Sequence, residues 1–392
     1  MMLRLAEKMS RLGTETAFDV LARAETLSHE GRDIINLGIG QPDFKTPEHI
    51  VEAAIKALHD GHHGYTPSPG IPQLRESVAQ DLVNYRGVNI APDRIVVVPG
   101  GKVTMFFAIL MFGEPGVDIL YPNPGFPIYQ SVIEFTGARA VPVQLLEENN
   151  FSFDADTILS QITKDTRLLI LNSPANPTGG AASKYEMDRL VSGLTDRHPE
   201  VAVLSDEIYS RITYDNNEHI SLLSYPELDD RLILLDGWSK TYAMTGWRMG
   251  YAVWPEALVE SATRLAVNCH SCVNSATQFA GIAALEGPQD AVDVMVSAFD
   301  ERRRLIVKGL NDLPGVQCCT PAGAFYAFPN IAATGLSARN LQDRLLEEAG
   351  VATVAGTSFG AMGEGFIRFS YANSIENIQR ALHRVEDLLE LN

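Results

Sequence analysis

The sequence predicts an α/β protein with a large domain, built on a mostly parallel mixed sheet flanked by helices, and a smaller α+β domain formed by both termini. Three observations predict this fold. Short apolar runs alternate with helical patterns from residue 94 onward. Polar and Gly-rich loops follow several of these runs, at the edge where an open sheet binds its ligand. A chain of 392 residues can also hold two domains, which we place at 45–286 and at 1–44 with 287–392.

The first 94 residues contain the predicted start of the small domain and two helices of the large one. A helix is expected over 16–30, and a strand beginning at Ile34 runs into a loop rich in Gly and Pro. A second helix is expected over 46–58, with Pro47 at its first position. A third is expected over 72–85. These elements lead into the region that builds the sheet.

The sheet itself is expected between residues 94 and 253, and the rest of the small domain after residue 287. The apolar runs that we assign to strands of the sheet are too short to be helices and have no helical period. We expect strands over 95–98, 118–121, 140–143, 168–171, 201–204, 231–235 and 249–253, and helices over 103–112 and 183–197. Beyond residue 287 we expect helices over 287–313, 338–349 and 374–390 and a strand over 366–370. The arginine cluster 302–304 is interpreted as a solvated helix face.

Composition excludes several classes of partner. The net charge of −18 argues against nucleic acid and against an anionic membrane. The longest apolar run, 103–112, is too short to span a bilayer, and no apolar core follows Arg4 and Lys8 as a signal peptide requires. The four cysteines include one C-x-x-C pair, Cys269 and Cys272, without a second ligand pair. The other two, Cys318 and Cys319, are expected to be small apolar residues in a strand. We therefore expect no metal site, reduced thiols and a cytoplasmic protein.

Two glycine patterns fail as nucleotide-binding motifs. Gly38 and Gly40 have the spacing of a dinucleotide fingerprint, but Pro42 stands where that fingerprint needs the start of a helix. The stretch that ends at Lys102 has no Ser or Thr after the lysine and lacks the upstream glycine of a P-loop. An enzyme that binds NAD or ATP is therefore disfavoured.

Lys240 is the residue around which the other motifs are arranged. It lies in the turn after the predicted strand 231–235, where α/β sheets place their chemistry. A lysine amine is a good nucleophile only when its pKa is lowered, and burial and a nearby cation such as Arg248 have that effect. Asp206 ends another predicted strand, and the turn that begins at Asn176 follows a third. These side chains should meet at one edge of the sheet.

With these motifs the chain resembles the class I/II aminotransferases, which are fold-type I, pyridoxal-phosphate-dependent enzymes of the aspartate aminotransferase superfamily. The resemblance runs from Gly38 to the last helix. The motifs that carry it occur in the family's order: Asn176-Pro177-Thr178-Gly179, Asp206-Glu207-x-Tyr209, Ser239-Lys240 with Arg248 eight residues later, and Arg368. The resemblance implies a transaminase that uses pyridoxal 5′-phosphate and acts on a small amino acid and a 2-oxo acid.

The resemblance also implies a role for each matching residue. Lys240, Asp206 and Tyr209 are the catalytic residues: Lys240 binds the cofactor covalently and acts as base then acid, while Asp206 keeps the ring nitrogen protonated. The implied cofactor-binding residues are Tyr65, Gly101, Lys102, Phe126, Asn176, Asp206, Tyr209, Ser239, Lys240 and Arg248. The implied substrate-binding residues are Gly38, Asn176 and Arg368, the last gripping the α-carboxylate. Tyr65 matches a tyrosine that reaches the phosphate of the neighbouring subunit, which implies a homodimer with shared sites. The resemblance also implies ping-pong kinetics, because a second 2-oxo acid reverses the cycle that the donor began.

The substrate and two rival functions stay open. Lys102 matches a lysine that meets the distal carboxylate of the substrate in one bacterial aspartate aminotransferase subgroup, which favours aspartate with 2-oxoglutarate as one pair. Glu15 and Ala17 stand where that subgroup has small hydroxyl residues, so an alanine or aromatic aminotransferase is an alternative. A C–S β-lyase or a synthase on the same scaffold is another. A non-enzymatic regulator with such a domain is a third, and the acidity of the chain opposes the DNA binding it would need.

Overall fold

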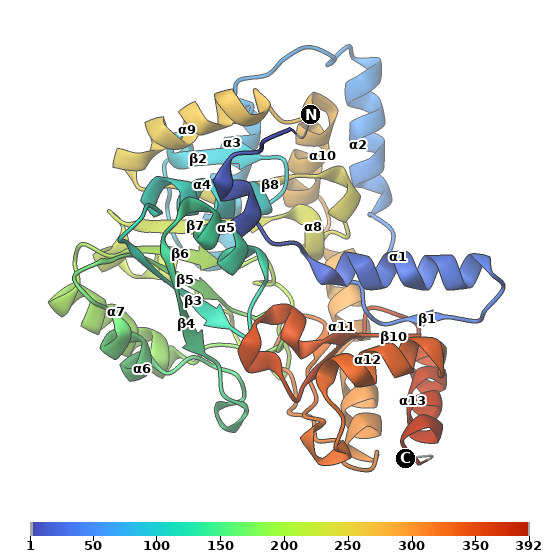
Figure 1. Cartoon of the computed structure of the whole chain (residues 1–392). Coiled ribbons are helices and arrows are strands. Elements are labelled where there is room, and N and C mark those ends of the chain that lie inside the picture. Colours follow the sequence, from blue (N-terminus) through green and yellow to red (C-terminus); the bar gives the residue numbers. More distant parts are fainter. Residues whose placement is uncertain (1–2, 391–392) are drawn as a thin grey trace.

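A seven-stranded β-sheet forms the centre of the computed structural model, which describes residues 3–390 (Figure 1). Its strands are β2 (Ile95–Val98), β3 (Asp118–Asn123), β4 (Arg139–Gln144), β5 (Thr166–Asn172), β6 (Ala202–Asp206), β7 (Leu232–Gly237) and β8 (Gly250–Val253). Their order across the sheet is β2-β8-β7-β6-β5-β3-β4. Only β8 runs antiparallel to its two neighbours, and the other neighbouring pairs are parallel. The predicted mostly parallel mixed sheet is confirmed.

Helices cover both faces of this sheet because alternate residues of each strand point to opposite sides. Ile95 and Val97 pack on one face, and Val96 and Val98 pack on the other. The first face is covered by α2 (Glu48–His59), α3 (Pro72–Arg86), α6 (Ala155–Gln161), α7 (Lys184–Arg197) and α10 (Ser275–Glu286), the second by α4 (Lys102–Phe112), α5 (Ile128–Thr136) and α9 (Glu256–His270). Among residues 3–390, no helix has both the length and the apolar character needed to cross a membrane.

A second group of elements from both ends of the chain lies beside the sheet, at the lower right of Figure 1. It contains α1 (Thr16–His29), β1 (Ile35–Asn36), α11 (Asp290–Asn311), β9 (Tyr326–Ala327), α12 (Ala338–Glu347), β10 (Val351–Ala352), β11 (Val354–Ala355), β12 (Ile367–Ser370) and α13 (Ile375–Glu390). β1 pairs with β10, and β11, β12 and β9 form a small antiparallel sheet. Side chains of α11, α12 and α13 share a separate apolar core. This supports our proposal of domains at 45–286 and at 1–44 with 287–392.

The arginine cluster of α11 is not the solvated face that the sequence suggested. Only Arg304 is exposed, whereas the side chain of Arg303 is 2% exposed and binds Asp215 through two nitrogens. Arg302 pairs with Asp43, in the segment that leads from β1 to α2. Three consecutive helix residues point in three directions, so a run of like charges does not define one face. The cluster ties α11 to two distant segments.

Cys318 and Cys319 do not lie in a strand, in contrast to the expectation. They follow an isolated bridge between Gln317 and Asn330. Cys318 is buried, and burial raises the pKa of its thiol to about 12. All four cysteines of the chain are free thiols. Cys318 therefore acts as a small apolar side chain, as expected.

Candidate active site

A cavity of about 530 Å³ opens where β5, β6 and β7 end. Most of the predicted site residues line it: Gly101, Lys102, Phe126, Asn176, Asp206, Tyr209, Ser239, Lys240, Arg248 and Arg368. Gly38 does not line the cavity, but its carbonyl accepts a hydrogen bond from Arg368. Tyr65 lies outside it and is 94% exposed. Asn176, Asp206 and Lys240 converge because they follow neighbouring parallel strands, whereas Arg368 reaches the cavity from β12 of the small antiparallel sheet.

Lys240 extends into the cavity from α8 (Trp238–Thr241), the short helix that directly follows β7. Its Nζ donates a hydrogen bond of 2.5 Å to the carbonyl of Gly40. Burial lowers the pKa of Lys240 to about 8, and the charges of Arg368 and Arg248 add to that effect. The sequence predicted that burial and Arg248 would lower the pKa of Lys240. The contribution of Arg368 is apparent only from the structure. The amine is therefore partly neutral near neutral pH.

Asp206 ends β6 and is buried at the wall of the cavity. Its Oδ2 accepts a hydrogen bond of 2.6 Å from the hydroxyl of Tyr129, and Oδ1 accepts a weaker one from the backbone of Ile208. Burial raises the pKa of Asp206 to about 7, although these hydrogen bonds oppose the rise. No cation pairs with Asp206 within residues 3–390. A buried carboxylate of this kind calls for a positively charged ligand.

Arg368 lies on β12 and is buried. Its Nη1 donates 2.8 Å to Oδ1 of Asn176, and its Nη2 donates 2.5 Å to the carbonyl of Gly38. Its Nε has no hydrogen-bond partner within the described part of the chain. The guanidinium is held between the rings of Tyr326 and Phe359, at 4.5 and 4.6 Å from their centroids. No carboxylate neutralises this buried cation there, and the arrangement fits an anionic ligand.

A second anion site surrounds the start of α4. Gly101 is the N-cap of that helix, and Gly100 has a φ of +94°, a conformation that favours glycine. A β-carbon on Gly100 would collide with the guanidinium of Arg248, so the glycine lets this cation approach the helix start. Arg248 forms no ion pair among residues 3–390. Backbone N–H groups at a helix N-terminus beside a free arginine suit a phosphate. Ser239 lines the same cavity.

Two tyrosines that the sequence did not single out belong to the site. Tyr129 contacts Asp206, and its ring lies edge-on to that of Phe126 at 5.8 Å between centroids. Tyr326 lines the cavity, and its hydroxyl is 2.8 Å from that of Tyr209. The proximity of Tyr129 to Phe126 in the sequence was a usable signal. For Tyr326 the only signal in the sequence is its place in a run rich in aromatic residues.

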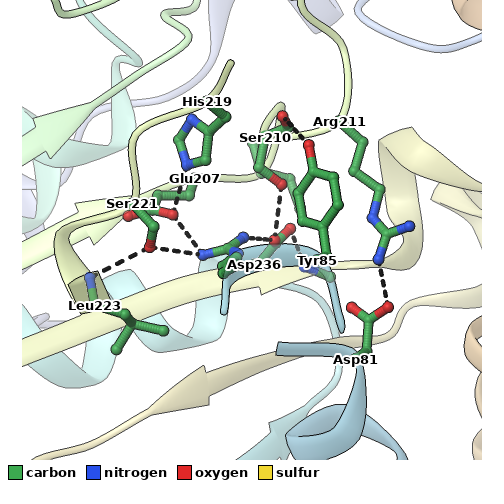
Figure 2. A network of polar contacts seen from close by, with 12 residues as sticks. Asp81, Tyr85, Glu207, Ser210, Arg211, His219, Ser221, Leu223 and Asp236 are labelled. Carbon is green, nitrogen blue, oxygen red and sulfur yellow. Dashed lines mark hydrogen bonds and ion pairs between the residues drawn. The ribbon is translucent and has the colours of Figure 1, made fainter. Parts of the chain in front are cut away.

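Behind the cavity, a buried ionic network joins the ends of β6 and β7 to α3 (Figure 2). Arg86 of α3 binds Glu207, at 2.5 Å, and Asp236. His219 lies 2.7 Å from the same Glu207. Burial opposes the charge of Glu207, but Arg86 and His219 outweigh it and lower the pKa to about 2. The network fixes the strand ends that carry Asp206 and lead to the lysine.

Comparison with known proteins places this arrangement in context. Residues 32–385 match the family model for aminotransferase class I and II. The chain is 37% identical to an aspartate aminotransferase of Pyrococcus horikoshii, over 98% of this chain and 97% of that one. It superposes on the crystal structure of an aspartate aminotransferase from Rhizobium meliloti with a TM-score of 0.94, at 34% identity and 99% coverage of both chains. The structure of an alanine aminotransferase from Pyrococcus furiosus superposes with a TM-score of 0.92, at 34% identity over 99% of this chain and 100% of that one.

Proposed function

The chain belongs to aminotransferase class I and II, and on that premise we propose that it is a pyridoxal-5′-phosphate-dependent enzyme that moves an amino group from an L-amino acid to a 2-oxo acid. The observation that carries the proposal is one cavity that holds both Lys240, with its pKa lowered to about 8, and the buried carboxyl group of Asp206. The named relatives are aminotransferases and do not favour the C–S β-lyase or synthase alternative.

The residues of the cavity fit this cofactor. Asp206 is a buried carboxylate that has no cationic partner among residues 3–390, and a protonated ring nitrogen would supply one. Gly101 and Arg248 form a cradle for a phosphate that a β-carbon on Gly100 would fill. Lys240 offers an amine for covalent attachment. The charge pattern of the cofactor thus matches the charge pattern of the cavity.

Five further predicted cofactor ligands line the cavity, whereas Tyr65 lies outside it. We propose that Asn176 and Tyr209 hydrogen-bond the oxygen on the ring, that Phe126 stacks on the ring, and that Ser239 and Lys102 support the phosphate side. Asn176, Tyr209 and Phe126 line the cavity near the lysine, which supports these roles. Lys240 lies 5.9 Å from the centroid of the Tyr209 ring. Tyr209 is buried and its pKa is raised well above its usual value, so its hydroxyl remains a donor.

The proposed mechanism assigns each step to a side chain. When bound, pyridoxal phosphate withdraws electrons from the α-carbon of the donor and makes its proton removable. Arg368 binds the α-carboxylate and holds the donor in place. The neutral Nζ of Lys240 would remove the α-proton, and the resulting ammonium group would deliver it to the cofactor rather than back to the α-carbon, so that the amino group leaves the donor. Asp206 would hold the ring nitrogen in its protonated form. The first product leaves before the acceptor binds to the same residues, so the kinetics are ping-pong.

For the substrate we propose aspartate or another dicarboxylic amino acid with 2-oxoglutarate as one pair, through a contact of Lys102 with the distal carboxylate. The relatives named for aspartate support this pair. The alanine aminotransferase among the similar structures keeps a neutral donor as the second candidate. Lys102 lines the cavity, but it already has an acidic neighbour, Glu15, at 2.6 Å.

We also propose a homodimer with shared active sites and a cytoplasmic location. The position of Tyr65 is compatible with the dimer, because its side chain is 94% exposed and lies outside the cavity of its own chain, so it is free to reach a second subunit. The free thiols support a reducing compartment. Sedimentation at assay concentration tests the dimer, and Tyr65→Phe should weaken cofactor binding in it. A fully active monomer would refute the shared site.

One experiment tests the proposed function. The purified protein should show a visible absorbance band after incubation with pyridoxal phosphate, and borohydride should abolish the band and leave the cofactor mass on the peptide that contains Lys240. A panel of amino acids should then be tested with 2-oxoglutarate and pyruvate as acceptors. Absence of both the band and amino transfer would refute the proposal. Substrate breakdown without an acceptor would instead indicate a lyase.

A further inference from the structure

The side chain of Glu15 does not cap the helix that it precedes. Glu15 is the N-cap residue of α1, where a short polar side chain would normally accept a hydrogen bond from the helix backbone. Its side chain makes no such bond and instead binds Nζ of Lys102 at 2.6 Å. Lys102 is the first residue of α4, so the contact joins segments 87 residues apart in the sequence. The carboxylate of Glu15 is therefore directed into the cavity.

The pair of Glu15 and Lys102 belongs to the substrate cavity. Both residues line it together with Arg368. The ammonium of Lys102 also lies 5.3 Å from the centroid of Phe126 and 5.9 Å from that of Phe18. The charge of Glu15 is close enough to raise the pKa of Lys240 and of Arg368, against the opposite effect of burial. Glu15 is thus an acidic group that faces the reacting centre.

We propose that Glu15 holds the place of the substrate's distal carboxylate on Lys102, so that Glu15 is the residue that sets the balance between dicarboxylic and neutral donors. A dicarboxylic substrate exchanges with Glu15 and takes Lys102 as its partner. A neutral donor leaves the pair of Glu15 and Lys102 intact and packs beside it. This inference rests on the proposed function, because it concerns the side-chain end of an amino acid bound through Arg368.

The exchange is favoured by the weakness of the pair it breaks. The side chain of Lys102 is 42% exposed and that of Glu15 is 18% exposed. Ion pairs at such accessible sites contribute little to stability, because water competes for both charges. Replacing one carboxylate by another leaves Lys102 paired in both states. The displaced carboxylate of Glu15 must in turn move toward water, because it loses its ion-pair partner.

The segment that carries Glu15 can also move with little loss of contact. Before α1, the chain is held to α5 mainly by Arg11, which donates to the carbonyl of Glu134 at 2.9 Å, and by the backbone of Gly13, which donates to the hydroxyl of Ser131. Residues 3–14 are exposed. Few buried contacts mean a low cost of local rearrangement. Glu15 can therefore leave Lys102 without disturbing the core.

The pocket must bind the donor and the acceptor in turn. Exchange of Glu15 for a substrate carboxylate on Lys102 would allow it to bind both. In a ping-pong reaction the donor and the acceptor bind the same residues, although their side chains can differ in charge. A fixed cation would reject neutral side chains because it would lose its water without gaining a partner. A cation with an exchangeable internal partner accepts both classes. The inference therefore predicts a broad donor range rather than strict specificity for aspartate.

The test compares Glu15→Gln with Asp19→Asn in the holoenzyme. Both substitutions remove one negative charge from α1, but Asp19 is exposed and does not line the cavity. The binding constant of succinate, a dicarboxylate that cannot react, is measured by calorimetry. The ratio of kcat/KM for aspartate over alanine is measured in parallel. Glu15→Gln should tighten succinate binding and raise the ratio by about three- to fivefold, as expected for removal of a part-exposed ion pair. Asp19→Asn should leave both unchanged.

A second variant separates exchange from simple repulsion. In the Lys102→Met background there is no cation to exchange, so Glu15→Gln should no longer improve succinate binding. An equal improvement with and without Lys102 would overturn the inference, as would no change in either background. If the wild-type enzyme transfers no amino group from any donor, the proposed function fails. If it does so and succinate binding ignores Glu15, only this inference fails.

Discussion

Tyr129 donates a hydrogen bond of 2.6 Å to Asp206, and both side chains are buried. The contact joins the first turn of α5 to the end of β6. It stabilises the charged form of a carboxyl group whose pKa burial raises to about 7. Without the tyrosine, burial would favour the neutral acid still more. A neutral acid cannot balance a protonated ring nitrogen, so Tyr129 acts as a positioning residue for the proposed cofactor partner.

The Tyr129→Phe variant should bind pyridoxal phosphate more weakly, roughly tenfold, because a hydrogen bond to a charged group is lost. The dissociation constant is measured by absorbance titration of the cofactor-free protein at pH 8. Tyr121→Phe is the matched control, since it removes another buried hydroxyl that binds Gln130 and does not touch Asp206. Equal effects of the two variants would show that Tyr129 contributes only to packing.

Replacement of Lys240 should have opposite effects on activity and stability. Lys240→Met should lower the rate of amino transfer by roughly 10²–10⁴-fold or more, because the proposed base is removed. The cofactor-free variant should be more stable than the wild type by roughly 3 kcal/mol at pH 7, because an ammonium with a pKa lowered from 10.5 to about 8 opposes folding. Urea unfolding measures the gain, with Lys184→Met, a change at an exposed lysine, as the control.

The gain in stability from Lys240→Met should depend on pH, because the pKa of Lys240 is lower in the folded chain than in the unfolded chain. The unfolded chain holds the proton of Lys240 up to about pH 10.5, whereas the folded chain releases it near pH 8. The stability of the wild type therefore rises with pH between these values. The advantage of Lys240→Met should be complete below pH 8 and vanish above pH 10.5. A gain that does not change with pH would mean that the cost of Lys240 is not its charge.

Arg368→Leu should reduce kcat/KM for all amino donors alike, by roughly 100-fold, since every donor carries the same α-carboxylate. Steady-state kinetics with aspartate, alanine and phenylalanine test this expectation. The Nε of Arg368 has no partner among the described residues, and its other nitrogens already contact Asn176 and Gly38. A loss confined to one class of donor would assign Arg368 to the side chain instead.

Local patterns were sufficient for most of the fold and for much of the candidate site. The seven strands of the sheet and the helices predicted beside it occur where short apolar runs and helical periods placed them, with ends shifted by one or two residues, whereas α6, α9 and α10 were not predicted. Asp206, Lys240 and Asn176 meet because each follows a strand of one parallel sheet, a rule that needs no side-chain detail. Arg368 joins them from the other group of elements, and its place was predicted by resemblance alone.

Contacts between distant segments could not be predicted in this way. The burial of Arg303 depends on Asp215, which is 88 residues away. The contact between Tyr129 and Asp206 spans 77 residues. Each is decided by how the elements pack, and the sequence near the arginine or tyrosine contains no sign of the partner. The same limit explains why Glu15 was recognised as acidic but not as a partner of Lys102.

The last prediction concerns Arg86, which neutralises Glu207 and Asp236 behind the cavity. Arg86→Met should lower the free energy of unfolding by roughly 3–5 kcal/mol at pH 8, because two buried carboxylates lose their shared cation. Arg264→Met, which breaks the exposed pair with Glu260 on α9, should cost less than about 1 kcal/mol. Urea unfolding of the cofactor-free proteins gives both values.

The loss in free energy of unfolding caused by Arg86→Met should become smaller as the pH falls. In the wild type the pKa of Glu207 is about 2, below its usual value of 4.5, so its contribution to stability is complete above pH 4.5 and is lost toward pH 2. In the variant His219 remains beside Glu207, but the loss of Arg86 moves the pKa of Glu207 upward from about 2. Asp236, whose pKa burial raises even beside Arg86, shifts the same way. The folded variant therefore takes up protons between pH 8 and pH 5, which relieves the buried charge. A deficit that stays constant over this range would show that Arg86 acts by packing rather than by charge.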